Sequence, residues 1–526
     1  MTASALQSHG DVQTLAAYAR QRALQYPDAV AFYEAGRTIG YGALLREAQA
    51  LAGGLWQTGL RPGDVISFQL PNWIETAIIN LAANLLGLRC NPIVPIFRDS
   101  ELLGILSAAR TRCLFVPQMW GGFDYAAMAR RLQSNLPELQ VVATVRAEQP
   151  RSHDYETLMA AGRGSEPPYP ELDPADAKLL MFTSGTSGRA KGVLHSQASL
   201  VAPLLRACAK WPLREHDCML MPSPVTHITG YCCGLEMPLF LGTRTVLMDK
   251  WNAATAVQLI QAEKVHATVG ATPFLKELLD AAEAAGTSLP SLRVFACGGA
   301  AVPAQLIERA DRLLSGRAFR VYGMSEAPLI TFGIAADDPP QVAAHTDGRL
   351  NGYEVRVVDT TSAADAAGDG EIWVRGSGLF RGYLDPADGA DAFTPDGFFR
   401  TGDLGRRAGD ALLITGRKKD LIIRGGENIS AKEIEDVLLA DPAIREAAAV
   451  SMPHERLGET VCLYAVLAPG CTIELQQVCG ILERVGLARQ KFPERLVIVD
   501  GLPKTPSGKI RKDLLRARLW GPGGGR

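Results

Sequence analysis

The chain has 526 residues, 47% hydrophobic and 21% charged, and its 54 lysines and arginines nearly balance 56 aspartates and glutamates, giving a net charge of −2. This balance is typical of a globular protein and excludes a disordered scaffold, while the lack of a basic excess argues against nucleic acid as a partner. The ten cysteines include no CxxC pair. Neither a zinc site nor a disulfide framework is therefore predicted.

The N-terminal segment lacks the basic start and apolar core of a signal peptide. The most apolar helical stretch, Thr76 to Leu88, is too short to cross a bilayer. We therefore expect a cytoplasmic protein without an integral membrane segment.

Helix-like and strand-like segments alternate along most of the chain, which predicts an α/β fold with largely parallel sheets. Helices are expected first over Thr14–Gln25, Tyr41–Leu55 and Ile74–Leu88. Buried strands are expected over Val65–Leu70, Cys113–Pro117, Leu179–Ser184, Ala267–Gly270 and Arg293–Gly299. After Val355, short strands with Gly and Asp turns predict a small antiparallel or barrel-like β unit.

From about Arg417 the pattern becomes that of a compact α+β domain. Helices are predicted over 431–440, 475–485 and 510–519, and strands over 447–451, 463–467 and 495–499. We therefore expect a large N-terminal domain over residues 1–418 and a small C-terminal domain over 419–526.

The strand Leu179–Ser184 leads into a loop with the sequence TSGTSGRAKG, which holds four hydroxyls, three glycines and Lys191. Glycines let the backbone approach an anion, hydroxyls donate to its oxygens, and a lysine adds positive charge. A polyphosphate needs these groups. The spacing is not that of a Walker loop, because Gly192 follows the lysine. A flexible surface loop is the alternative interpretation of this segment alone.

This loop resembles the phosphate loop of the adenylate-forming superfamily, which includes acyl-CoA synthetases and adenylation domains. Ser187 stands where Thr is usual and Ala190 where Pro is usual, and neither change removes a donor. The resemblance implies that Lys191 is catalytic and that ATP is bound by Thr183, Ser184, Gly185, Thr186, Ser187, Gly188 and Lys191.

The segment Val321–Ala327, VYGMSEA, resembles the family's next motif. The match implies that Tyr322 stacks on adenine, that Ser325 contacts the α-phosphate, and that Glu326 is a catalytic carboxylate holding Mg²⁺, a cation that prefers oxygen ligands. A nucleophile elbow GxSxG is the competing interpretation, and it fails because Ala327 replaces the last glycine. A hydrolase is therefore a weaker alternative.

Three further motifs follow the family's pattern. Cys297–Ala301 resembles a turn against adenine and the acyl group, which implies contacts from Gly299 and Ala300. The ribose is implied to bind Asp403, in FRTGDL, and Arg417, in TGRKKDLIIRGGEN. The motif PKTPSGK implies that Lys509 is the catalytic lysine and contacts ATP; a basic tail is the alternative, but it would not need the rigid TPSG turn.

The resemblance implies an ATP-dependent acid–CoA ligase with ATP, Mg²⁺ and coenzyme A. A carboxylate attacks the α-phosphate to give acyl-adenylate, and a thiol then displaces AMP. The small domain is implied to be mobile, turning about Lys419 between the two steps so that Gly425 and Gly426 line the CoA tunnel.

By family position the acid pocket draws on Pro222–Tyr231 and neighbouring turns. Its predicted residues are Val225, His227, Gly299, Gly323 and Met324. His227 matches a gating position, although a structural role is equally expected for a single histidine. The segment has no Asp for an α-ammonium group and no Arg or Lys for a second carboxylate. This predicts a medium-chain, alicyclic or aromatic monocarboxylic acid, as in fatty acid metabolism, and VTHITG resembles cyclohexanecarboxylate-type ligases.

Two other functions stay open. One is a free-standing adenylating enzyme that loads a carrier protein, and the other is a catalytically silent nucleotide-binding protein, which the presence of Lys509 and Glu326 disfavours. The oligomeric state, monomer or homodimer, is not determined by these motifs.

Overall fold

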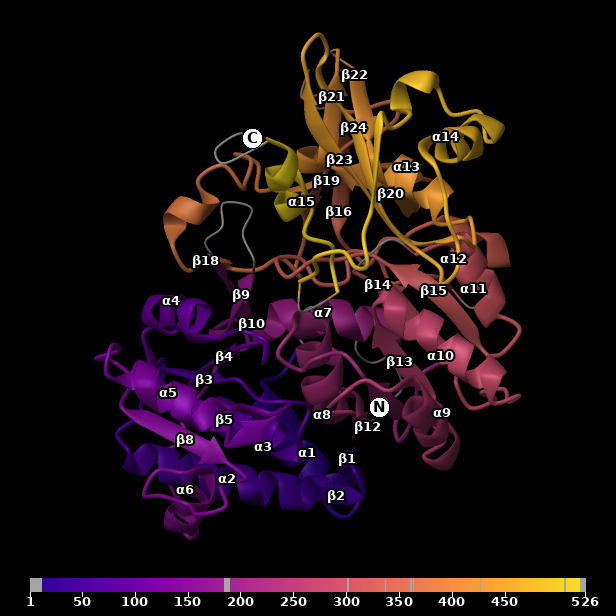
Figure 1. Cartoon of the computed structure of the whole chain (residues 1–526). Helices are drawn as coiled ribbons and strands as arrows, with labels where there is room; N and C mark the ends of the chain where they lie inside the picture. The colour runs from indigo at the N-terminus through magenta and orange to yellow at the C-terminus, as the bar shows by residue number, and fades with distance from the viewer. Residues whose placement is uncertain are drawn as a thin grey trace.

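The computed structural model describes residues 12–183, 190–299, 302–335, 337–359, 362, 364–425, 427–505 and 508–520. Two seven-stranded sheets form the large N-terminal body, and a four-stranded and a five-stranded sheet follow (Figure 1). The helices of the body are α1 (Leu15–Gln25), α2 (Tyr41–Gln57), α3 (Ile74–Leu85), α4 (Asp99–Ala109), α5 (Tyr125–Gln133), α6 (Tyr155–Gly162), α7 (Gln197–Cys208), α8 (Met237–Leu241), α9 (Ala253–Ala262), α10 (Thr272–Ala284), α11 (Ala304–Ala310) and α12 (Pro340–His345). The α/β prediction is confirmed.

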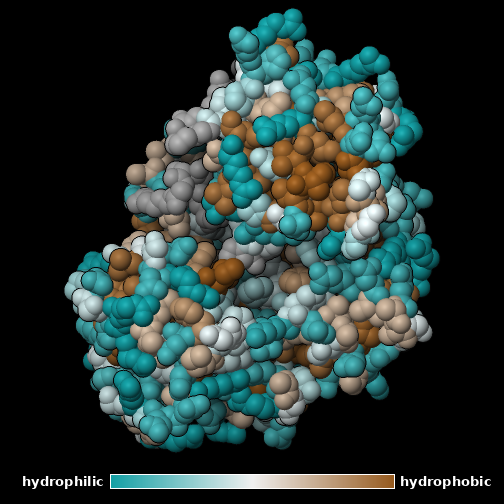
Figure 2. Space-filling model, viewed as in Figure 1, coloured by the Kyte–Doolittle hydropathy of each residue, from teal (hydrophilic) through white to brown (hydrophobic). Residues whose placement is uncertain are grey.

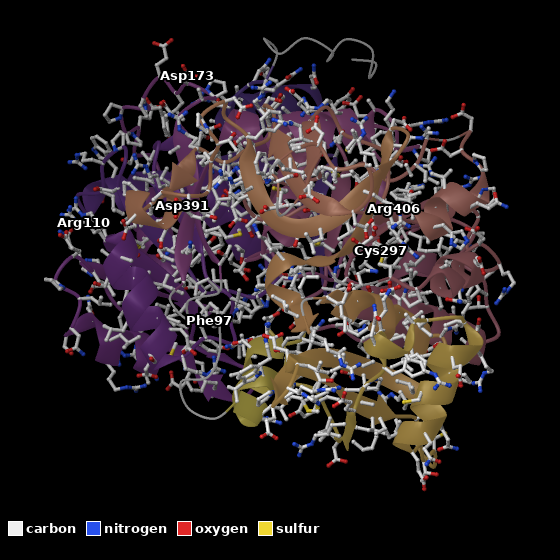
Figure 3. The ribbon with its side chains drawn as sticks, turned by 90° about the horizontal axis from the view of Figure 1, so that it is seen from above. Phe97, Arg110, Asp173, Cys297, Asp391 and Arg406 are labelled. Carbon is white, nitrogen blue, oxygen red and sulfur yellow. The ribbon has the colours of Figure 1, made fainter. Side chains whose placement is uncertain are left out.

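The first large sheet has the order β15-β14-β13-β11-β12-β1-β2 and is parallel except for the β1–β2 hairpin. Parallel strands need crossover helices, which cover the sheet. The strands are β1 (Val30–Glu34), β2 (Arg37–Gly40), β11 (Cys218–Met221), β12 (Arg244–Leu247), β13 (Ala267–Gly270), β14 (Val294–Gly298) and β15 (Arg317–Val321). Figure 3 shows Cys297, on β14, inside the ribbon, and Arg110 at its rim.

The second large sheet has the order β18-β10-β9-β4-β3-β5-β8. Its strands are β3 (Val65–Phe68), β4 (Arg89–Pro92), β5 (Thr111–Pro117), β8 (Val141–Val145), β9 (Ala177–Thr183), β10 (Lys191–Ser196) and β18 (Gly382–Tyr383). The short hairpin β6 (Met119–Trp120) and β7 (Phe123–Asp124) pairs apart from it. Because β18 pairs with β10, Tyr383 lies beside Val193, two residues after Lys191.

The β unit expected after Val355 is an open antiparallel sheet. It is formed by β16 (Glu354–Val358), β17 (Gly370–Arg375), β19 (Phe399–Ala408) and β20 (Ala411–Arg417). Register pairs Asp403 with Arg417 on neighbouring strands. The sheet therefore brings together two predicted ribose-binding residues.

The C-terminal α+β unit follows the single turn Lys418–Asp420. It consists of β21 (Leu421–Arg424), β22 (Glu427–Ser430), α13 (Ala431–Leu438), β23 (Ile444–His454), β24 (Gly458–Leu467), α14 (Leu475–Arg484), β25 (Arg495–Ile498) and α15 (Lys512–Trp520). Helices α13 and α14 bury one face of the sheet, while α15 packs on the other. Figure 2 shows apolar side chains gathered on this upper part of the molecule, above a mostly polar lower part.

Two predicted helix ends differ in the structure. The helix expected to reach Leu88 ends at Leu85, because Gly87 adopts a φ of +67°. The helix expected from Ile510 begins at Lys512, because Ile510 pairs with Lys504 and closes the preceding loop. Among the described residues, no helix combines the length and apolar character that crossing a membrane requires.

Candidate active site

Asp403 is the centre of a buried hydrogen-bonded group. The Tyr322 hydroxyl, just after β15, donates to its Oδ2 at 2.7 Å, and Arg417 Nε lies 2.7 Å from its Oδ1. Burial, followed by the Asp403 charge, raises the pKa of Tyr322, so this hydroxyl remains a donor. A carboxylate has about four acceptor sites. Asp403 therefore keeps acceptor capacity for a diol while its orientation is fixed from both sides.

Glu326 lies in the turn after β15 and is buried. The Tyr383 hydroxyl donates to its Oε1 at 2.9 Å. Burial raises the pKa of this carboxyl. No cluster of three metal-ligating side chains occurs in the described part of the chain. A single carboxylate at this position fits Mg²⁺, which commonly takes one or two carboxylates and completes its shell with phosphate and water.

Lys191 begins β10 and points toward the same region. Its Nζ donates to the Asp388 carbonyl at 3.1 Å and lies 5.0 Å from the centre of the Tyr383 ring. The Tyr383 side chain therefore contacts both this lysine and Glu326. Thr183 ends the preceding strand β9. The other predicted phosphate-loop residues lie outside the described residues: Ser184, Gly185, Thr186, Ser187 and Gly188.

Lys509 reaches the site from the C-terminal unit. Its loop is closed by Thr505, whose N–H donates to the Lys509 carbonyl at 2.7 Å. Burial lowers the pKa of Lys509, and Arg417 lowers it further, while Asp403 and Glu326 oppose this shift. Its Cε lies 4.0 Å from the position that a Cβ on Gly299 would occupy. The charge of the predicted catalytic lysine thus interacts with the predicted ribose-binding carboxylate, Asp403, and with the predicted metal carboxylate, Glu326.

Of the predicted acid-pocket residues, Gly299 and His227 are close enough to Lys509 to interact with it. His227 is half-buried, and burial together with the positive charge of Lys509 lowers the pKa of His227 to about 4. Val225 is fully buried, and a Cβ at Gly323 would lie 2.6 Å from the Leu329 nitrogen, so only glycine fits there. Met324 is half-buried, and Ala300 lies outside the described residues.

The predicted hinge and CoA residues lie apart from one another. Lys419 is in the turn between the two units, and Arg516 of α15 donates to its carbonyl at 2.6 Å. Burial lowers the pKa of Lys419. Gly425 lies in the β21–β22 turn, which Figure 1 places at the outer end of the C-terminal sheet. Gly426 is outside the described residues.

Two site residues escaped the sequence analysis. Tyr383 lies on β18, and His195 lies on the neighbouring strand β10. The Nε2 atom of His195 lies 2.6 Å from the Ser325 carbonyl, and its Nδ1 atom lies 2.9 Å from Ser199 Oγ. A carbonyl only accepts, so Nε2 carries the proton. Burial lowers the pKa of His195 to about 4. No motif around either residue indicates its partner, which lies 57 positions away for Tyr383 and 130 positions away for His195.

Comparisons with known proteins identify the family of this chain. The family described as "AMP-binding enzyme" matches residues 19–384, and "AMP-binding enzyme C-terminal domain" matches residues 433–509. The chain is 36% identical over 515 residues to a medium-chain fatty-acid–CoA ligase of Escherichia coli (strain K12). This match covers 96% of this chain and 90% of the relative.

A salicyl-AMP ligase / salicyl-S-ArCP synthetase of Mycobacterium tuberculosis (strain ATCC 25618 / H37Rv) is 33% identical over 518 residues, with 96% of this chain and 91% of the relative covered. ATP-bound MatB from Rhodopseudomonas palustris superimposes with a TM-score of 0.84 at 26% identity, over 96% of this chain and 99% of that chain. The chain therefore belongs to the family of AMP-binding enzymes, the adenylate-forming superfamily that includes the acyl-CoA synthetases, as its motifs predict.

Proposed function

We propose that this chain is an ATP-dependent, AMP-forming acid–CoA ligase that acts on a hydrophobic monocarboxylic acid. One observation carries the proposal: Lys509 of the C-terminal unit is half-buried against Gly299 of the large body, where its charge interacts with Asp403 and Glu326. A half-buried cation that interacts with two carboxylates suits a reaction that joins a carboxylate to a nucleotide phosphate. Membership of the family and the medium-chain ligase relative support the same activity.

The first half-reaction is a displacement at phosphorus. A carboxylate oxygen of the acid forms a bond to the α-phosphorus of ATP, and the bond to pyrophosphate breaks. Proteins promote such transfers mainly by positioning the reactants and stabilising charge. Lys509 holds the two anions together, Asp403 and Arg417 orient the ribose, and Tyr322 packs on adenine. Lys191 contacts the β- and γ-phosphates. Mg²⁺ bound at Glu326 supplies positive charge to the phosphates.

The second half-reaction transfers the acyl group to CoA. The thiol sulfur forms a bond to the acyl carbon, AMP leaves, and the thiol proton passes to solvent. Lys509 has no second carboxylate to neutralise in this step. We propose that residues 419–526 turn about Lys419 relative to residues 1–418, which withdraws Lys509 and brings Gly425 and Gly426 toward the thiol. The present arrangement, with Lys509 in the site, is the one suited to adenylation.

The acid is proposed to be a medium-chain, alicyclic or simple aromatic monocarboxylic acid. Val225 is buried, Met324 is half-buried, and His227, whose pKa is lowered to about 4, is uncharged at neutral pH. Pockets of this kind discriminate by shape, at about 1–3 kcal/mol for each methylene. The cyclohexanecarboxylate-type specificity stays a prediction within this class.

Loading of a carrier protein is the second candidate, because the salicyl-S-ArCP synthetase is similar to this chain along its whole length. The test measures pyrophosphate release from ATP with octanoate, cyclohexanecarboxylate, benzoate and salicylate. The best acid is then supplied with free CoA or with a phosphopantetheinylated carrier protein, and the thioester is identified by mass. Thioester on CoA supports the ligase, thioester only on the carrier supports the alternative, and no pyrophosphate with any acid contradicts both.

A further inference from the structure

The turn that carries Val225 and His227 has few backbone donors of its own, although the His227 N–H donates to the Pro224 carbonyl at 2.9 Å. It connects β11 to the π-helix η2 (Gly230–Glu236) and includes Pro222 and Pro224. A proline has no backbone N–H, so these two positions contribute no donor to a neighbouring carbonyl. A buried carbonyl without a donor is costly. The shape of this wall of the pocket therefore depends on donors from elsewhere in the chain.

The side chain of Asn72 supplies two of these donors, and the Met248 N–H supplies another to the Met221 carbonyl at 3.3 Å. The Asn72 Nδ2 donates to the carbonyls of Met221 at 3.2 Å and Ser223 at 2.9 Å, and its Oδ1 accepts from the Val225 N–H at 2.8 Å. Asn72 is 4% exposed and lies in the turn between β3 and α3, which belongs to the other large sheet. One amide thus contacts three backbone groups of the pocket turn across the boundary between the two sheets.

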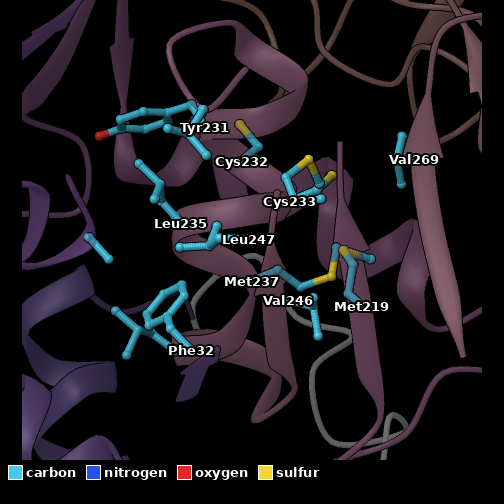
Figure 4. Close-up of a cluster of buried hydrophobic side chains, with 14 of the residues drawn as sticks. Phe32, Met219, Tyr231, Cys232, Cys233, Leu235, Met237, Val246, Leu247 and Val269 are labelled. Atoms are coloured by element: carbon cyan, nitrogen blue, oxygen red, sulfur yellow. The ribbon is translucent and has the colours of Figure 1, made fainter. Parts of the chain in front are cut away.

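The segment after His227 is also fixed by hydrogen bonds. The Tyr231 N–H donates to the His227 carbonyl at 2.8 Å, and the Tyr231 hydroxyl donates to Asn80 Oδ1 at 2.8 Å. Figure 4 shows Tyr231, Cys232 and Cys233 of η2 in the buried cluster. The π-helix is a rare conformation that often occurs at functional sites. The far end of the turn is thus embedded in the core, while its near end is held by Asn72 and by the Ser223 hydroxyl, which donates to the Val269 carbonyl at 3.3 Å.

We propose that Asn72 is a positioning residue that sets the selectivity of the acid pocket. It does not touch the reacting atoms; it acts through the turn that presents Val225 and His227 to the acid. This inference rests on the proposed function, because it assumes that the pocket binds a carboxylic acid. An aspartate has the same shape but only accepts. In Asn72→Asp, an oxygen would face the carbonyls of Met221 and Ser223, and the turn would have to move.

The experiment compares Asn72→Asp with Gln69→Glu as a matched control. Gln69 is also a buried amide, three residues earlier, and its Nε2 donates to the backbone carbonyls of Val94 at 3.1 Å and Phe97 at 2.9 Å. It does not bond to the pocket turn. Pyrophosphate release is measured in wild type and in both variants. In the first series the concentration of octanoate, cyclohexanecarboxylate or benzoate is varied at saturating ATP, and in the second series the concentration of ATP is varied.

For Asn72→Asp we expect the KM for the preferred acid to rise at least tenfold, the ratio of kcat/KM between two acids to change at least fivefold, and the KM for ATP to stay within twofold. Gln69→Glu should leave the ratio between acids unchanged. An unchanged ratio in Asn72→Asp, or equal losses for all acids and ATP, would overturn the inference.

If Asn72→Asp does not fold, Asn72→Ser removes the amide donors without adding a charge and is judged by the same ratio. If neither variant folds while Gln69→Glu does, Asn72 serves the fold rather than selectivity. A wild type inactive with every acid refutes the proposed function instead.

Discussion

Replacing Lys509 by alanine separates the two proposed half-reactions. In the proposed mechanism Lys509 donates to both the attacking carboxylate and the α-phosphate, and a hydrogen bond to a charged group contributes about 1.5–3 kcal/mol. Two such bonds amount to about 3–6 kcal/mol, which corresponds to a loss of about 10²–10⁴ in rate at 1.36 kcal/mol for each factor of ten. We therefore expect Lys509→Ala to lose acyl-AMP formation by two to four orders of magnitude, on the scale of that estimate.

The stability of the variant provides an independent check. Burial lowers the pKa of Lys509, so the folded state binds this proton less tightly than the unfolded state does. Below its lowered pKa, the charged lysine thus costs the folded state free energy. Lys509→Ala should unfold in urea at a concentration equal to or above that of wild type. A clear loss of stability would indicate a structural role for this lysine.

The assay measures the steps separately. Adenylation is followed by acid-dependent exchange of labelled pyrophosphate into ATP, and thioester formation is followed after addition of synthetic acyl-AMP and CoA. We expect Lys509→Ala to make thioester from acyl-AMP at a rate near that of wild type. Lys504→Ala is the matched control: it removes a lysine of the same loop that is paired with Glu446. Equal damage to both steps by Lys509→Ala would refute the alternating-domain proposal.

Three further outcomes are expected. Lys191→Ala should raise the KM for ATP about tenfold or more, because a charge-assisted contact to phosphate contributes about 1.5–3 kcal/mol; an unchanged ATP dependence would remove it from the phosphate site. Lys419→Pro should slow thioester formation more than adenylation, because proline fixes φ at about −65°. A larger loss of adenylation than of thioester formation would contradict the proposed hinge at Lys419. Burial holds the pKa of His195 at about 4, so the unfolded state binds more protons between that value and 6.5. The free energy of unfolding of wild type should fall as pH drops through this window, and His195→Gln should flatten the urea-unfolding profile measured there.

The local sequence determined the order of the elements and the chemistry at the ends of strands. Strand β13 occupies Ala267–Gly270 as expected, because a short apolar run between turn signals has few other conformations. The motif residues Glu326, Asp403 and Lys509 could be named because the short segments that hold them resemble motifs of the adenylate-forming superfamily. These features are local, and a single sequence displays them.

Only the tertiary structure decided which distant groups support that chemistry. Tyr383 contacts Glu326, His195 contacts the Ser325 carbonyl, and Asn72 contacts the turn at Val225 across 153 positions. Hydrogen bonds depend on position and orientation in space, and no periodicity or spacing along the chain encodes these pairs. The partners became visible only where strand pairing and the packing of the two large sheets brought them within about 3 Å of each other.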